Sequence, residues 1–287
     1  MKLLTFKSHA EAPPHLGVAV GDCIVDLTQQ LANPPANMQG LIEGWTHYRA
    51  EVTRIAAVAR PDLTLAEATL LAPVQRPGKI LGIGLNYADH VAESGMAKPE
   101  HQLWFAKMPT SVQPPYGIVE LPKVSAALDY EAELAFVIGK RCRHVPRAQA
   151  AEVIFGYCAA NDVSVRDWQL RTSQFMLGKS FDTHCPFGPW IVTPDELGDP
   201  HQLNITCTVN GEVRQHSNTE HLIFRCADMI EHLSQVMTLE PGDLILTGTP
   251  GGVGAGFTPP RWLTAGDVVE VVIDKIGTLR HVVTPES

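Results

Sequence analysis

The sequence predicts an α+β fold that is rich in β-strands, with a small N-terminal domain ahead of a larger one. Short apolar segments bounded by Gly, Pro and Asn recur along the chain, and only a few stretches have helical spacing. Strands and helices do not alternate regularly, which disfavours Rossmann and TIM-barrel architectures. The length of 287 residues accommodates one large domain or two unequal ones.

Residues 1–72 are predicted to form the small N-terminal domain. Three short apolar segments predict strands: Lys2–Phe6, Leu16–Val20 and Cys23–Leu27. A loop rich in Pro and Asn follows them, and Trp45–Arg60 is predicted to be helical. The Pro- and Gly-containing segment 73–78 marks the predicted domain boundary.

Residues 73–287 are predicted to form the larger, strand-rich domain. Its predicted strands are Ile80–Ile83, Glu131–Ile138, Phe155–Ala160, Trp190–Thr193, Leu203–Val209, Asp243–Leu246 and Val268–Ile273. Asn210-Gly211 lies between two of these apolar runs and predicts a two-residue hairpin turn. The predicted helices are Arg147–Ile154, Val165–Thr172 and Leu222–Met237.

Composition and charge argue against several classes of function. The formal net charge is −9 and there is no long run of Lys or Arg, which disfavours binding to nucleic acid or to an anionic membrane. No apolar stretch reaches the roughly 20 residues of a membrane span. The start of the chain does not resemble a secretory signal, and the six cysteines form no C-x-x-C pair. We therefore expect a cytoplasmic protein with free thiols.

Two glutamates in one predicted strand are the first candidate site residues. Glu131 and Glu133 point to the same side because side chains alternate along a strand. Adjacent carboxylates repel one another unless a cation lies between them, and oxygen ligands suit Mg²⁺, Mn²⁺ or Ca²⁺. The alternative is that both glutamates face water on an amphipathic strand.

A third carboxylate follows the next apolar run. Asp162 comes directly after a predicted buried strand and could project into a site. Equally, Asp162 or Ser164 could cap the helix that is expected to follow.

His90 and Glu93 are three residues apart, so they would share one face of a helix. A carboxylate that orients an imidazole makes a general base for water, whereas the alternative is an ordinary surface pair.

Lys179 stands in mostly apolar surroundings, where it could neutralise an anionic substrate or an enolate, or else extend to the surface.

The glycine-rich segment 247–256 could hold a carboxylate through its N–H groups and the Thr249 hydroxyl, or be a plain turn.

Taken together, these segments resemble the fumarylacetoacetate hydrolase (FAH) family. The motifs are Gly-Leu-Asn-Tyr-x-x-His-x-x-Glu, Asp-Tyr-Glu-x-Glu-Leu, Asn-Asp-Val-Ser-x-Arg-Asp, Gly-Lys-Ser-Phe-Asp, Val-Asn-Gly-Glu and Thr-Gly-Thr-Pro-x-Gly-Val-Gly, in this order. The resemblance runs from about Lys79 to Val283. It implies an FAH-like mixed β-sandwich or roll for residues 73–287, a homodimer, and a divalent metal, Mg²⁺ or Mn²⁺.

The resemblance also implies roles for individual residues. Glu131, Glu133 and Asp162 match the metal ligands of the family, and His90 and Glu93 match its catalytic pair on a lid. Lys179 matches the lysine near metal and substrate, and Thr249 the threonine near the substrate carboxylate. Gln113 and Arg166 lie in matching segments but receive no role here. Phe175 and Met176 differ from many relatives, which leaves the substrate open.

The implied activity is a catabolic, metal-dependent hydrolase acting on a small 2-oxo acid. It would cleave a carbon–carbon bond of a 2,4-diketo acid of the acylpyruvate type, giving pyruvate or a related 2-oxo acid and a carboxylic acid. The alternatives are an oxaloacetate-type decarboxylase, a 2-oxo acid isomerase or hydratase, and a ureidoglycolate lyase, since a fold does not fix a reaction.

Overall fold

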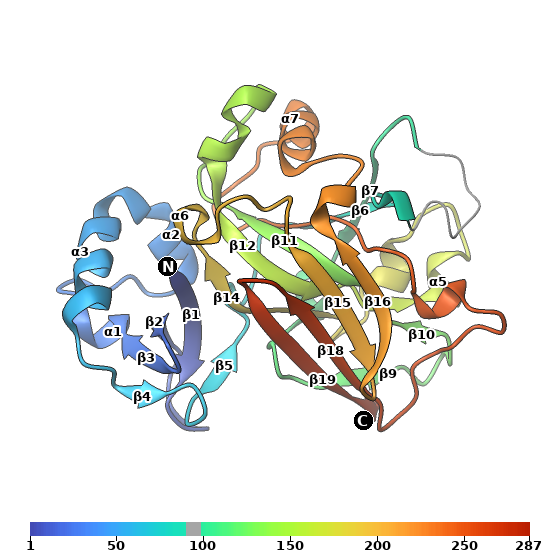
Figure 1. Cartoon of the computed structure of the whole chain (residues 1–287), viewed down its shortest axis with the longest axis horizontal. Coiled ribbons are helices and arrows are strands. Elements are labelled where there is room, and N and C mark those ends of the chain that lie inside the picture. The colour runs from blue at the N-terminus through green and yellow to red at the C-terminus, as the bar shows by residue number, and fades with distance from the viewer. Residues whose placement is uncertain (90–98) are drawn as a thin grey trace.

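The computed structural model describes residues 1–89 and 99–287. Within these residues the strands form a sheet of twelve strands, a sheet of five strands and a two-stranded ladder (Figure 1). The strand-rich α+β architecture predicted from the sequence is confirmed.

The large sheet runs through the whole molecule. In spatial order its strands are β4 (Leu63–Thr64), β3 (Cys23–Asp26), β2 (His15–Val20), β1 (Lys2–Lys7), β14 (Cys185–Val192), β12 (Ile154–Asn161), β11 (Ala132–Ile138), β17 (Leu244–Leu246), β6 (Ile80–Gly84) and β7 (Leu103–Lys107). Two short strands pair beside this path: β5 (Thr69–Leu71) with β1, and β8 (Val112–Gln113) with β14. The N-terminal strands thus join the sheet that carries the predicted site.

The junction between the two predicted domains is a strand pairing. Lys2 of β1 lies opposite Val192 of β14, in antiparallel register. The N-terminal strands and helices form the left-hand part of Figure 1, beside the larger part. A boundary at residue 72 stays a prediction.

The second sheet covers one face of the large sheet. Its strands are β16 (Glu212–Asn218), β15 (Asn204–Val209), β18 (Val268–Ile273), β19 (Gly277–Pro285) and β9 (Val119–Leu121). Leu134 and Phe136 of β11 belong to the same buried apolar cluster as Ile205 and Val271 of this sheet.

The Asn210-Gly211 turn is confirmed, because Val209 pairs with Glu212 around it. Both turn residues have a positive φ, 52° at Asn210 and 80° at Gly211, as a tight hairpin turn of this kind requires. A separate ladder pairs β10 (Leu128–Asp129) with β13 (Ser164–Val165).

The helices are short and lie around the sheets. The α-helices are α1 (Leu27–Gln30), α2 (Met38–Glu43), α3 (Trp45–Val58), α5 (Arg166–Gln169), α6 (Pro194–Leu197) and α7 (Cys226–Val236). The 3₁₀ helices are η1 (Pro109–Ser111), η2 (Arg147–Val153), η3 (Met176–Lys179), η4 (Thr219–His221) and η5 (Gly254–Gly256). Among the described residues, no helix has the length and apolar character needed to cross a membrane.

Several predicted elements differ from the observed ones. The helix predicted at Arg147–Ile154 is the 3₁₀ helix η2, and the one predicted at Leu222–Met237 is shortened to α7. The helix expected at Val165–Thr172 is reduced to α5, because Val165 pairs with Leu128 as a strand residue. The strand expected at Trp190–Thr193 begins at Cys185 instead, in spite of its prolines. Its pairing with β12 is irregular there, which accommodates prolines that cannot donate to a ladder.

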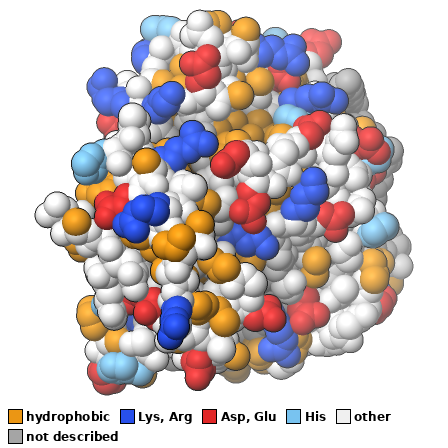
Figure 2. All heavy atoms as spheres, turned by 60° about the vertical axis from the view of Figure 1, so that its left-hand side comes forward, with side chains coloured by type: hydrophobic (Ala, Val, Ile, Leu, Met, Phe, Trp, Pro, Cys, Tyr) orange, Lys and Arg blue, Asp and Glu red, His pale blue; other side chains and the backbone are white. Residues whose placement is uncertain are grey.

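Charges of both signs are interspersed on the face of the molecule drawn in Figure 2. No basic stripe crosses this face, in keeping with the acidic composition.

Candidate active site

Three carboxylates meet where β11 and β12 lie side by side. Glu131 directly precedes β11, Glu133 lies within it, and Asp162 directly follows β12. Because Ala132 pairs with Asn161, this register brings the three residues together, and the Asp162 N–H donates to the Glu131 carbonyl over 2.9 Å. One carboxylate oxygen of each residue lies within 4.8 Å of the others.

All three carboxylates are buried. The exposed fractions are 6% for Glu131, 1% for Glu133 and 0% for Asp162. The alternative that both glutamates face water is therefore wrong. The alternative that Asp162 or Ser164 caps a helix is also wrong, because Val165 holds the N-cap position of α5 and no side chain caps it.

Lys179 lies between two of the carboxylates. Its Nζ is 2.6 Å from Glu131 Oε2 and 2.7 Å from Asp162 Oδ2, and the residue is 1% exposed. Burial lowers the pKa of Lys179, but the charges of Asp162 and Glu131 outweigh this and raise it above its ordinary value. Lys179 is therefore a buried, charged ammonium and does not extend to the surface.

Two further cations, the buried Lys107 and the largely buried Arg166, complete the cluster, and neither was assigned a role from the sequence. Lys107, at the end of β7, places its Nζ 2.6 Å from Asp162 Oδ1. Arg166 binds Glu131 Oε1 over 2.6 Å through Nη1 and Asp129 Oδ2 over 2.8 Å through Nε. Burial opposes the charge of Arg166, but Asp129 and Glu131 raise its pKa. For Lys107 the available signal in the sequence was a single Lys at the end of an apolar segment, whereas Arg166 stands among polar residues and carries no such signal.

Glu133 is the carboxylate without a cationic hydrogen-bond partner among the described residues. Its Oε2 accepts from the Gly248 N–H over 2.6 Å. Burial, followed by the charges of Asp162 and Glu131, raises the pKa of Glu133 well above its ordinary value. A cation bound beside Glu133 would favour the charged form of this carboxyl.

The residues present fit a divalent metal ion. When all four are ionised, Asp129, Glu131, Glu133 and Asp162 carry four negative charges against the three positive charges of Lys107, Arg166 and Lys179. Ligation by oxygen alone suits Mg²⁺ or Mn²⁺. Each carboxylate oxygen has two lone-pair positions, so an oxygen that already accepts from a lysine can also bind a cation.

A cavity of about 200 Å³ opens on this cluster. Its polar side consists of Glu131, Arg166, Gln169, Lys179 and Thr249. Its apolar side includes Leu85, Leu103, Phe105, Leu170 and Phe175. The Phe105 and Phe175 rings are 6.2 Å apart, and Lys179 Nζ lies 4.8 Å from the Phe105 ring centre.

The glycine-rich segment 247–256 does hold carboxylates, but they are the protein's own. Gly248 donates to Glu133, and Gly254 and Ala255 donate to Asp129 over 2.7 and 3.0 Å. The Thr249 hydroxyl donates to the Ala132 carbonyl and accepts from Gln215. This segment is therefore part of the scaffold of the site, with Thr249 at the cavity wall.

The structure brings together five of the seven site residues that the sequence indicates: Glu131, Glu133, Asp162, Lys179 and Thr249. His90 and Glu93 lie outside the described residues. The six cysteines are free thiols.

Comparison with known proteins gives a consistent result. The family described as "Fumarylacetoacetate (FAA) hydrolase C-terminal" matches residues 79–284. A mitochondrial oxaloacetate tautomerase of Rattus norvegicus is 42% identical over 284 residues, which cover 97% of this chain and 90% of the relative.

The solved structures that match over their full lengths include two enzymes of known reaction type. Maleylpyruvate hydrolase from Sphingobium sp., in complex with manganese(II) and pyruvate, is 34% identical with a TM-score of 0.84. The 5-carboxymethyl-2-hydroxymuconate delta-isomerase from Mycobacterium smegmatis is 35% identical with a TM-score of 0.79. Each comparison covers 100% of both chains.

Proposed function

The chain belongs to the fumarylacetoacetate hydrolase family, and we propose that it is a divalent-metal-dependent enzyme that stabilises the enolate of a 2-oxo acid. We further propose that its reaction is hydrolytic cleavage of a 2,4-diketo acid of the acylpyruvate type. The observation that carries the proposal is the buried Lys179 ammonium between Glu131 and Asp162, beside Glu133 and at the end of a cavity. The bound pyruvate and manganese of the Sphingobium hydrolase support it.

Glu131, Glu133 and Asp162 would hold Mg²⁺ or Mn²⁺. When bound, such an ion polarises the oxygens of the 2-oxo acid as a Lewis acid. Lys179 then offers its ammonium to the oxygen that gains negative charge in the enolate. Arg166 and Lys107 neutralise the surrounding carboxylates, so that an anionic substrate can enter the cavity.

Hydrolysis also needs an activated water. The proposed base is His90, oriented by Glu93, which removes a proton from water as its oxygen adds to the C4 carbonyl. The bond between C3 and C4 then breaks, C4 leaves in a carboxylic acid, and the electron pair remains on C3 as the enolate. Protonation at C3 gives pyruvate or its substituted relative.

A second candidate is keto–enol tautomerisation of oxaloacetate. The 42% identity to a tautomerase over nearly the whole chain favours it. This reaction passes through the same enolate and needs proton transfer at C3 and at the enol oxygen, but no attack by water. Lys179 would have the same role in both reactions.

One experiment separates the two candidates. Metal-stripped protein, with and without added Mn²⁺ or Mg²⁺, is given acetylpyruvate or enol-oxaloacetate, and the products are followed by NMR. Metal-dependent formation of pyruvate and acetate in equal amounts supports the hydrolase. Faster ketonisation of oxaloacetate with acetylpyruvate left intact overturns the hydrolase in favour of the tautomerase. Inactivity in both assays contradicts both.

The compartment and the assembly are also proposals. We propose a cytoplasmic homodimer. The six free thiols support a reducing compartment, and a dimer is the assembly that the family resemblance implies. Light scattering on the eluting protein tests the assembly, and a monomeric mass would contradict it.

A further inference from the structure

We propose that Asn86 is a positioning residue for Glu133, acting through the single peptide group that joins Thr247 to Gly248. The inference rests on the proposed role of Glu133 as a metal ligand.

The Asn86 side chain is held in one orientation. It is fully buried, and its Nδ2 donates to the Thr247 carbonyl over 2.8 Å and to the Phe224 carbonyl over 2.9 Å. Its Oδ1 accepts from the Phe224 N–H over 2.8 Å. Both amide protons and the amide oxygen thus form hydrogen bonds. Any other orientation of the side chain would lose at least one of these bonds.

The opposite side of the same peptide group faces the metal site. The Gly248 N–H donates to Glu133 Oε2 over 2.6 Å. A peptide group is planar, so the Thr247 carbonyl and the Gly248 N–H turn together. A donor on the carbonyl also polarises the group and strengthens the N–H as a donor. Asn86 therefore determines both the direction and the strength of this bond to Glu133.

The close approach of the two segments depends on glycine at position 248. Gly248 has a φ of +93°, and a Cβ at this position would lie 2.8 Å from Asn86 Cβ. Two hydrogen bonds to the Leu134 carbonyl, from the Thr247 N–H and hydroxyl, hold the preceding side of the peptide. Asn86 binds the Thr247 carbonyl, so the peptide group between Thr247 and Gly248 is held on both sides.

Glu133 depends on the Gly248 N–H more than the other two carboxylates depend on any single partner. Glu131 and Asp162 each bind two cationic groups, whereas Glu133 accepts only the Gly248 N–H among the described residues. Removing a group that hydrogen-bonds to a metal ligand and orients it typically weakens metal affinity 10–100-fold. Loss of the Asn86 amide should therefore weaken metal binding through Glu133.

The test is Mn²⁺ binding to metal-stripped protein, measured by calorimetry without substrate. Asn86→Asp keeps the shape and the acceptor for the Phe224 N–H but replaces the Nδ2 donor to the Thr247 and Phe224 carbonyls with an oxygen. We expect the Mn²⁺ Kd to rise at least tenfold. Asn218→Asp, on β16 and away from the cluster, is the matched control and should leave the Kd unchanged. An Asn86→Asp Kd within twofold of the wild type overturns the proposal.

A double-mutant cycle separates positioning from a general structural effect. In a Glu133→Gln background, Asn86→Asp should change the remaining Mn²⁺ affinity by less than twofold, because the route through Glu133 is gone. An equal loss in both backgrounds would overturn the proposal. If Asn86→Asp does not fold, Gly248→Ala disturbs the same peptide from its other end and should raise the Kd likewise. Absence of Mn²⁺ binding in the wild type would instead contradict the proposed function.

Discussion

Lys107 and Asp162 form an ion pair of 2.6 Å in which both side chains are completely buried. Asp162 binds Lys179 through its other oxygen, so one carboxylate receives two ammonium groups. Of the two lysines, only Lys179 lines the cavity. The two lysines therefore have different roles. Lys107 holds Asp162 in place, and Lys179 faces the substrate.

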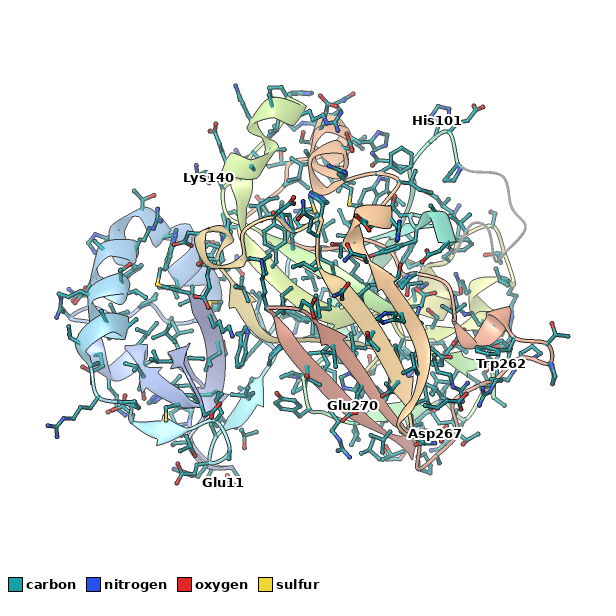
Figure 3. All side chains as sticks on the ribbon, viewed as in Figure 1. Glu11, His101, Lys140, Trp262, Asp267 and Glu270 are labelled. Carbon is teal, nitrogen blue, oxygen red and sulfur yellow. The ribbon has the colours of Figure 1, made fainter. Side chains whose placement is uncertain are left out.

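Lys107→Met should destabilise the protein. It removes one partner of a buried ion pair, which costs about 3 kcal/mol when a charge is left less compensated. The measurement is the free energy of unfolding in urea. Lys140→Met is the control, since Lys140 is exposed (Figure 3) and such substitutions usually change stability by less than about 0.5 kcal/mol. Equal stability of the two variants would show that Lys107 is dispensable for the cluster.

Lys179→Met should abolish most turnover while Mn²⁺ still binds. The substitution removes the ammonium offered to the enolate oxygen, and one such electrostatic donor contributes about 10²–10³ in kcat. The measurement is kcat at saturating Mn²⁺ with acetylpyruvate and with oxaloacetate, beside a Mn²⁺ titration of the same protein. A loss of less than tenfold in both reactions would contradict the role given to Lys179.

Much of the scaffold could be predicted from the sequence, because it follows from local patterns. The strand β11 and the Asn210-Gly211 turn are visible over a few residues, and both predictions are confirmed. The length of β14 was not predictable, because its prolines normally disfavour a strand and only the irregular pairing with β12 accommodates them.

The site was predictable only in part. Glu131 and Glu133 share a face through local geometry, but their burial depends on segments distant in the sequence, which contribute Arg166, Lys179 and Gly248. Lys107 and Arg166 owe their importance to ion pairs with residues 55 and 35 positions away in the sequence. Such long-range pairs are set by the sheet register, so only the structure reveals them.

Phe175→Ala should change the preference among acylpyruvates. Phe175 and Phe105 form part of the apolar wall of the cavity. Under the proposed function the acyl group lies there, and each buried methylene contributes about 1–3 kcal/mol to discrimination. We expect kcat/KM to fall about tenfold more for valerylpyruvate than for acetylpyruvate. Phe257→Ala, outside this cavity, is the control, and an equal fall for both substrates would place the acyl group elsewhere.

His281→Leu should reduce the sensitivity of the fold to acid. Burial lowers the pKa of His281 to about 3, whereas an unfolded chain binds the proton at an ordinary pKa of about 6.5. Between these values the unfolded state holds more protons, so the stabilisation is complete above pH 6.5 and is lost as the pH falls toward 3. Over the 1.5 pH units from 6.5 to 5, this group should cost the wild type about 2 kcal/mol. Urea unfolding at both pH values measures the loss, with the exposed His232→Leu as control. A loss in His281→Leu as large as that of the wild type would assign the acid sensitivity to other groups.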